Sequence, residues 1–156
     1  MDRVTITLPE ETVTIYHRYF TTLSTREFKK LIMNNRFSTF QNETIINEGE
    51  SPDRLYIMLR GTVSVIKDRT TLATLDPGDF IGEMSFLTRE EASASAYAED
   101  LVQCAYWTHA DLEKLKLKNN GVYDKFIAIV GCDLVRKLKH RNDQHVDLVT
   151  KLDLVV

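Results

Sequence analysis

Short runs of β-forming residues, each ended by turn-forming residues, recur along the middle of this chain. From residue 36 to residue 107 they follow one another at intervals of about ten residues. The runs are Glu43 to Asn47, Arg54 to Leu59, Thr62 to Lys67, Thr71 to Leu75, Ser93 to Ala98, and Val102 to Trp107. Strands this short and this closely spaced are typical of a jelly roll or a small barrel. The segment 36–107 is therefore predicted to be a β-roll.

A helical cap is expected before the β-roll. Apolar residues between Thr12 and Phe20 fall near helical spacing, and Ser24 with Glu27 forms a capping-box pattern that opens a second helix. Residues 3–8 alternate apolar residues with threonine and are predicted to form a short strand. Residues 1–35 are thus expected to hold an N-terminal strand and two helices.

Two more helices are expected after the β-roll. Thr108 is a suitable N-cap for a short helix that stops near Asn119 to Gly121, and a longer helix follows between Val122 and Arg141. Residues 142–156 form a tail whose strand-like spacing could pair with residues 3–8. The expected fold class is mainly β with flanking helices (α+β), with helices at 108–141.

The long helix carries an apolar stripe and a basic end. Phe126, Val130, Leu134 and Leu138 recur every four residues, and we expect the stripe to form a homodimer through residues 122–138. The alternative is that the stripe packs only on its own β-roll. Basic residues crowd the last turns, where cations complement the helix dipole; a solvated helix end is the expectation, and contact with an anionic membrane is the alternative. They are Arg136, Lys137, Lys139 and Arg141.

The stretch from Asp76 to Ala96 has the features of a phosphate cradle. Pro77 and Gly78 form a turn, and Gly82 lets the backbone come close to a ligand. If residues 83–87 make a helical turn, its first N–H groups have no partner within the helix and suit an anion. The carboxylate of Glu83 would repel a phosphate but accepts hydrogen bonds from a sugar hydroxyl.

These residues resemble the phosphate-binding cassette of the cyclic-nucleotide-binding domain family. Phe80, Gly82 and Glu83 match the first half of the family pattern, and the small residues 93–95 match its second half. At the position of the family's phosphate-binding arginine this chain has Ala92, and a charge-assisted contact is therefore missing. Arg89 is the only basic residue within the cassette, and three positions away it is expected to point to solvent.

The resemblance implies a set of ligand contacts. Glu83 would hold the ribose, and backbone N–H groups with small side chains would hold the cyclic phosphate. The expected ligand-binding residues are Gly82, Glu83, Met84, Ser85, Ser93 and Ala94.

Over most of its length the chain is also similar to the Popeye-domain branch of the same superfamily. The matching features are Tyr16 to Phe20, Phe28, Asp53 to Leu55, Gly61, Trp107, and Gly131 to Leu138. That branch also lacks the cassette arginine and is described as binding cyclic AMP. It occurs as the cytoplasmic portion of membrane proteins, so membrane attachment is expected only through segments outside this chain.

The composition limits the possible partners. The formal net charge is −3, and no segment combines clustered basic residues with aromatic ones, so nucleic acid is not an expected partner. Cys104 and Cys132 have no metal-binding spacing, which indicates buried thiols in a reducing, cytosolic compartment. No apolar run reaches the roughly 20 residues of a membrane span.

Catalytic classes find little support in the sequence. The four histidines lie on predicted helices or beyond the β-roll, so no strand presents a histidine pair for a metal, and Ser85, Ser93 and Ser95 have no histidine base. A helix-turn-helix is not expected within residues 142–156, which are too few to hold one. We expect a non-enzymatic sensor of cyclic AMP or a related cyclic nucleotide, without metal or cofactor. The alternative is a degenerate cassette that binds nothing and serves as a dimerisation or protein-interaction module.

Overall fold

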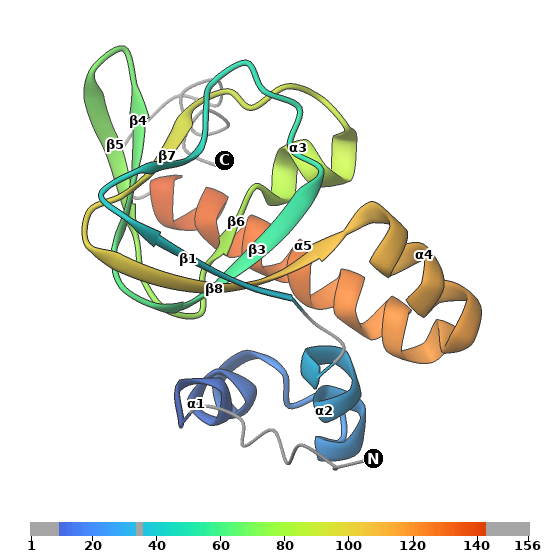
Figure 1. The fold of residues 1–156 in the computed structure, drawn as a ribbon. Helices are drawn as coiled ribbons and strands as arrows, with labels where there is room; N and C mark the ends of the chain where they lie inside the picture. The colour runs from blue at the N-terminus through green and yellow to red at the C-terminus, as the bar shows by residue number, and fades with distance from the viewer. Residues whose placement is uncertain (1–9, 34–35, 143–156) are drawn as a thin grey trace, which may run out of the picture.

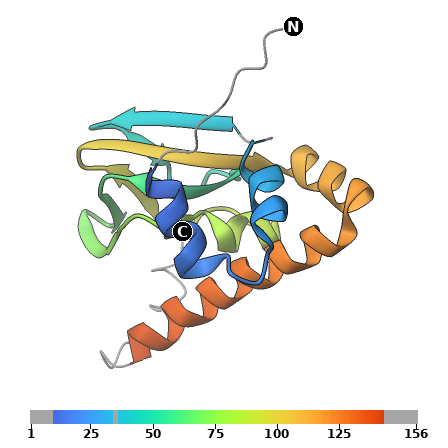
Figure 2. The same cartoon turned by 90° about the horizontal axis from the view of Figure 1, so that it is seen from below.

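The computed structural model describes residues 10–33 and 36–142, which form two antiparallel sheets flanked by helices (Figures 1 and 2). One sheet has the strand order β1-β8-β3-β6 and the other β2-β7-β4-β5. The strands are β1 (Arg36–Gln41), β2 (Thr44–Ile46), β3 (Arg54–Arg60), β4 (Val63–Lys67), β5 (Thr70–Leu75), β6 (Phe80–Ile81), β7 (Ser95–Ala98) and β8 (Leu101–Thr108). The helices are α1 (Glu10–Tyr19), α2 (Thr25–Met33), α3 (Glu83–Thr88), α4 (His109–Lys118) and α5 (Asn120–Asn142). The predicted mainly-β fold with flanking helices and a long C-terminal helix is confirmed.

Strand β3 is buried on both faces because it separates two apolar clusters. Successive side chains of a strand point to opposite sides of the sheet. Leu55 and Ile57 therefore join the helices in one cluster, while Tyr56 and Met58 enter the interior of the roll. The sequence of β3 thus reads as a continuous apolar run.

The helices cover one face of the sheet that contains β3 and β8. Phe20, Phe28, Phe126 and Trp107 belong to the same buried cluster, and the rings of Trp107 and Phe126 lie 4.7 Å apart. In Figures 1 and 2, α4 and α5 form a hairpin at one end of the roll. The helical cap and α5 are thereby fixed to the same sheet.

Local capping signals in the sequence proved correct. Ser24 and Glu27 exchange the two hydrogen bonds of a capping box, at 3.1 and 2.9 Å, and Thr108 with Asp111 does the same at the start of α4. Strands β1 and β6 were not predicted. The long helix begins at Asn120, so Gly121 lies inside its first turn instead of in a loop. The predicted strand at 3–8 and the tail beyond 142 lie outside the described residues.

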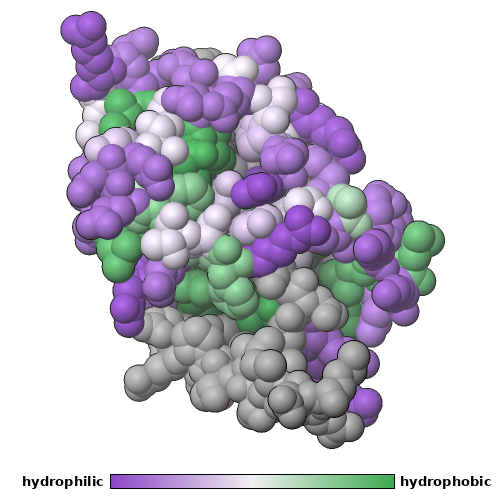
Figure 3. All heavy atoms as spheres, in the orientation of Figure 1, coloured by the Kyte–Doolittle hydropathy of each residue, from purple (hydrophilic) through white to green (hydrophobic). Residues whose placement is uncertain are grey.

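The apolar stripe on α5 is not an exposed surface, which corrects the expectation on which the dimer was based. Phe126 and Val130 have exposed fractions of 0% and belong to the core of their own domain, while Leu134 and Leu138 are half-buried. The expectation of two buried thiols is also wrong for Cys132, which is exposed, and right for Cys104. The face shown in Figure 3 carries apolar side chains in patches interrupted by hydrophilic ones. Among the described residues, no helix is long and apolar enough to cross a membrane.

Candidate functional site

The first half of the cassette is a turn, a two-residue strand and a short helix. The backbone of Met58 accepts a hydrogen bond from Gly78 N–H at 2.8 Å and donates one to the carbonyl of Asp79 at 2.9 Å, so the turn is tied to β3. Gly82 follows β6 with a φ angle of 86° and precedes α3. A side chain there would be strained and would meet Ile46 at 3.0 Å, which explains the glycine. The predicted helical turn at residues 83–87 is confirmed as α3.

The second half of the cassette is held by the loop after β2. Ala92 N–H donates to the carbonyl of Glu50 at 2.7 Å, and Gly49 N–H donates to the carbonyl of Ala92 at 2.9 Å. The Ser95 hydroxyl accepts a hydrogen bond from Glu48 N–H at 2.9 Å. Ala92 has an exposed fraction of 3% and lies in the interior cluster of the roll. A methyl group thus occupies the core at the position where the family pattern has arginine.

Glu83, the first residue of α3, is paired with Lys137 of α5. Lys137 Nζ donates to Glu83 Oε1 at 2.6 Å and to the carbonyl of Phe80 at 2.7 Å. The two side chains have exposed fractions of 0% and 13%. Burial raises the pKa of Glu83 to about 7, and the charge of Lys137 partly opposes that rise. The second carboxylate oxygen, Oε2, is buried and has no hydrogen-bond partner among the described residues.

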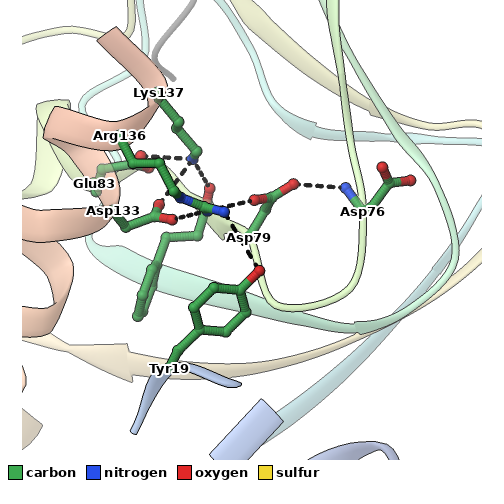
Figure 4. A network of polar contacts seen from close by, with 8 residues as sticks. Tyr19, Asp76, Asp79, Glu83, Asp133, Arg136 and Lys137 are labelled. Atoms are coloured by element: carbon green, nitrogen blue, oxygen red, sulfur yellow. Dashed lines mark hydrogen bonds and ion pairs between the residues drawn. The ribbon is translucent and has the colours of Figure 1, made fainter. Parts of the chain in front are cut away.

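A network of charged side chains surrounds this pair and joins four elements of the chain (Figure 4). Asp133 and Arg136 of α5 form an ion pair, and Asp133 Oδ2 also lies 3.3 Å from Lys137 Nζ. Arg136 reaches Asp79 Oδ1 in the cassette turn at 3.2 Å and the Tyr19 hydroxyl of α1 at 3.4 Å. Burial alone would lower the pKa of Lys137, but the neighbouring carboxylates raise it. The network therefore favours a charged Lys137 between the cassette and α5.

The sequence matches the cyclic nucleotide-binding domain family over residues 39–119, which is more than half of the chain. The chain belongs to the cyclic nucleotide-binding domain family. Part of a lysophospholipase NTE1 from Phaeosphaeria nodorum is 29% identical over 94 residues, covering 57% of this chain and 6% of that protein. Part of a cGMP-dependent protein kinase from Eimeria tenella is 33% identical over 81 residues, covering 52% of this chain and 8% of that protein. The chain spans less than a tenth of the length of these curated relatives.

Solved structures share the fold of this cyclic nucleotide-binding domain. A cyclic nucleotide-binding domain from Methylobacillus flagellatus KT has a TM-score of 0.80 and 25% identity, covering 86% of this chain and 80% of that one. The second binding domain of PKAR, with Sp-2Cl-cAMPS bound, has a TM-score of 0.70 and 19% identity, covering 91% of this chain and 92% of that one. The β-roll and its flanking helices are therefore those of the family.

The predicted ligand-binding residues of this cyclic nucleotide-binding domain differ in exposure. Gly82, Glu83, Ser85 and Ala94 are buried, and Met84 and Ser93 are half-buried. Glu83, Met84 and Ser85 are the first three residues of α3, Gly82 is its N-cap, and Ser93 with Ala94 directly precedes β7. Glu83 differs from the expectation in having a cationic partner within the chain.

The expectation of a fully solvated helix end fails for two of the basic residues on α5. Lys137 is largely buried and Arg136 joins the charged network, whereas Lys139 is exposed as expected. The spacing of Asp133 with Arg136 and Lys137, three and four residues apart, was the available sequence signal. It indicates ion pairs along one face of a helix, but it does not identify Glu83 as a partner.

A second contact joins the cassette helix to the C-terminal helices. The rings of Phe86 in α3 and His109 in α4 are stacked, with centroids 3.9 Å apart and an angle of 2° between planes. Burial lowers the pKa of His109, and nearby Arg89 lowers it further. A neutral imidazole is thus favoured against the Phe86 ring. Within residues 10–33 and 36–142, no group of acidic, histidine and cysteine side chains is arranged to hold a metal ion.

Proposed function

We propose that this domain is a non-enzymatic sensor that binds a cyclic nucleotide of the cyclic AMP type in the cassette and responds by moving α5. The observation that carries this proposal is the pairing of Glu83 with Lys137. A carboxylate at the start of the cassette helix is suited to a ribose hydroxyl, and here it is bound by a cation from the C-terminal helix. Ligand and helix would then compete for the same group.

The phosphate would be bound without an arginine. The backbone N–H groups of Glu83, Met84 and Ser85 belong to the first turn of α3, where intrahelical partners are absent, and Ser93 with the Ala94 N–H would bind from the opposite side. Loss of a charge-assisted contact costs on the order of 1.5–3 kcal/mol, or roughly ten- to hundred-fold in affinity. We therefore expect weak binding by the wild-type domain.

Competition between ligand and helix follows from burial. A ribose hydroxyl can approach Glu83 only if the carboxylate becomes accessible, and at present its exposed fraction is 0%. If Lys137 withdrew, Asp133 and Arg136 would move with it, because Asp133 pairs with both residues three and four positions along α5. Binding at the cassette would thus release the C-terminal part of α5 for a downstream partner.

The Popeye-domain branch is our proposal for the closest functional class. Several of its matching features meet in space: Phe20, Phe28 and Trp107 share one core cluster, and the segment 131–138 supplies the charged network. With that branch we also propose a cytosolic location and membrane attachment through segments outside this chain.

Calorimetric titration with cyclic AMP and cyclic GMP tests the sensor. Lys137→Gln should strengthen binding at least about ten-fold, because the competing cation is removed. Lys139→Gln, which removes an exposed cation of the same helix, should leave the affinity unchanged. Glu83→Gln should weaken binding by removing the acceptor for the ribose.

Ala92→Arg restores the family's arginine and tests the cradle itself. If the variant stays folded by circular dichroism and binds more tightly than wild type, the remaining phosphate contacts are intact. If neither Ala92→Arg nor Lys137→Gln shows a heat of binding, the sensor proposal is wrong. The degenerate cassette acting as an interaction module would then be the better explanation, supported by the burial of Ala92 in the core.

A homodimer through residues 122–138 remains part of the proposal, on a different surface from the original one. Val135 has an exposed fraction of 50%, and Cys132 beside it is exposed. These residues, together with the half-buried Ile129, would supply the contact, because Phe126 and Val130 are used by the core.

A further inference from the structure

A hollow lies away from the cassette, where α2, the start of β1, the end of β8 and the α4–α5 hairpin meet. Its volume is about 530 Å³, within the range of roughly 300–1,000 Å³ that is typical of small-molecule sites. None of the cassette residues 76–96 lines it. The hollow is therefore separate from the proposed nucleotide site.

The rim of this hollow is strongly cationic. Lys30 of α2, Arg36 of β1, and Lys114 and Lys118 of α4 all line it, with Asp111 as the carboxylate among them. Asp111 is already used, because it accepts the Thr108 N–H of the capping box at 3.0 Å and lies 3.6 Å from Arg36. The three lysines have no ion-pair partner among the described residues. Four positively charged side chains from three elements thus line one hollow, and only one negatively charged side chain lies among them.

Part of the wall of the hollow is apolar, and one of its residues carries a buried donor without a partner. Leu31, Leu115, Val122 and Trp107 line it. Trp107 has an exposed fraction of 3%, and its Nε1–H is buried without an acceptor in the described part of the chain. A buried N–H without an acceptor is unfavourable, so a ligand oxygen that accepts from it would be stabilised.

We propose that this hollow binds a small organic anion: a carboxylate or phosphate monoester with an apolar body. The anionic group would be held by the lysines of α4 and α2 and would give the Trp107 N–H an acceptor. The apolar body would lie against Leu31, Leu115 and Val122. An inorganic anion would leave this wall uncovered, and an uncharged amphiphile would leave the cations unpaired.

The single tryptophan of the chain makes the site directly observable. In a ¹⁵N-labelled protein the indole N–H gives one resonance, which can be followed during titration with octanoate. We expect a saturable downfield shift, since the N–H gains an acceptor. Octanol keeps the apolar body without the charge, and inorganic phosphate keeps the charge without the apolar body. Each should bind at least about ten-fold more weakly than octanoate.

Two double variants complete the test. Lys114→Gln with Lys118→Gln should weaken octanoate binding at least about ten-fold, whereas Lys29→Gln with Lys139→Gln, which removes the same charge from exposed positions elsewhere, should not change it. Glu83→Gln should also leave octanoate binding intact, which separates this site from the cassette. The proposal is overturned if octanoate gives neither a shift nor a heat of binding, if octanol or phosphate binds as well, or if the two double variants behave alike.

Discussion

Lys137 Nζ and Glu83 Oε1 lie 2.6 Å apart, although the two residues are 54 positions apart in the chain. The contact joins the first residue of the cassette helix to the last turns of α5. Because both side chains are largely withdrawn from water, breaking the pair without replacing a partner would leave a buried charge, which is costly. The position of α5 and the state of the cassette are therefore coupled.

The pH dependence of stability should report the burial of Glu83. Its pKa is raised from an ordinary value of 4.5 to about 7, so between these values the folded state holds more protons than the unfolded state. The contribution of Glu83 to the free energy of unfolding is fully present below about pH 4.5. It is lost as the pH rises through about 7, by up to about 3 kcal/mol. Urea denaturation of wild type and Glu83→Gln across this range measures it.

The difference between these two proteins isolates Glu83, because His109, whose effect on stability runs in the opposite direction, is present in both. Because the pKa of His109 is lowered in the folded state, its contribution to stability is lost as the pH falls. Equal pH profiles for wild type and Glu83→Gln would contradict the burial of an ionisable carboxyl at residue 83.

Two glycines in the left-handed region should differ in their tolerance of alanine. Gly49 has a φ of 87° with no atom within 4 Å of an added Cβ, so Gly49→Ala should cost about 1–2 kcal/mol of strain. At Gly61, with a φ of 101°, the added Cβ would lie 2.5 Å from the carbonyl oxygen of Leu101. Gly61→Ala should cost about 1–3 kcal/mol more, because backbone must move. Equal midpoints of thermal unfolding would contradict this.

Phe86 should be important for the stability of the cassette region. Its exposed fraction is 4% and its ring is stacked on His109, so Phe86→Ala should destabilise the domain by about 3–5 kcal/mol. Leu87 on the same helix is 40% exposed, and Leu87→Ala is the matched control, with an expected effect within about 0.5 kcal/mol. Chemical denaturation of both variants checks the contrast; similar losses would show that the Phe86 contact is not a specific anchor.

The proposed dimer can be tested without disturbing the core. Val135→Glu places a charge on an exposed position of α5 and should convert a dimer to a folded monomer in sedimentation velocity. Val130→Glu is expected to unfold the domain instead, because Val130 has an exposed fraction of 0%. A wild-type monomer at high micromolar concentration would remove the dimer from the proposal.

Much of the fold could be predicted because the responsible signals are local. Strand spacing, the capping boxes at Ser24 and Thr108, and the glycine before α3 each depend on residues within a few positions of one another. Strand β6 was missed because two residues are too few to show a period. Strand β1 was missed for a different reason: its side chains are exposed or half-buried, so it lacks an apolar run.

What the sequence by itself determined was the β-roll, the place of the cassette and the absence of arginine at residue 92. Only the tertiary structure decided that Ala92 lies in the core, that Phe126 and Val130 are used internally, and that Lys137 reaches Glu83. These facts depend on how α5 packs against the cassette and the sheet. A helical pattern specifies which residues share a face, but what that face contacts is set by the burial of apolar surface summed over the whole domain.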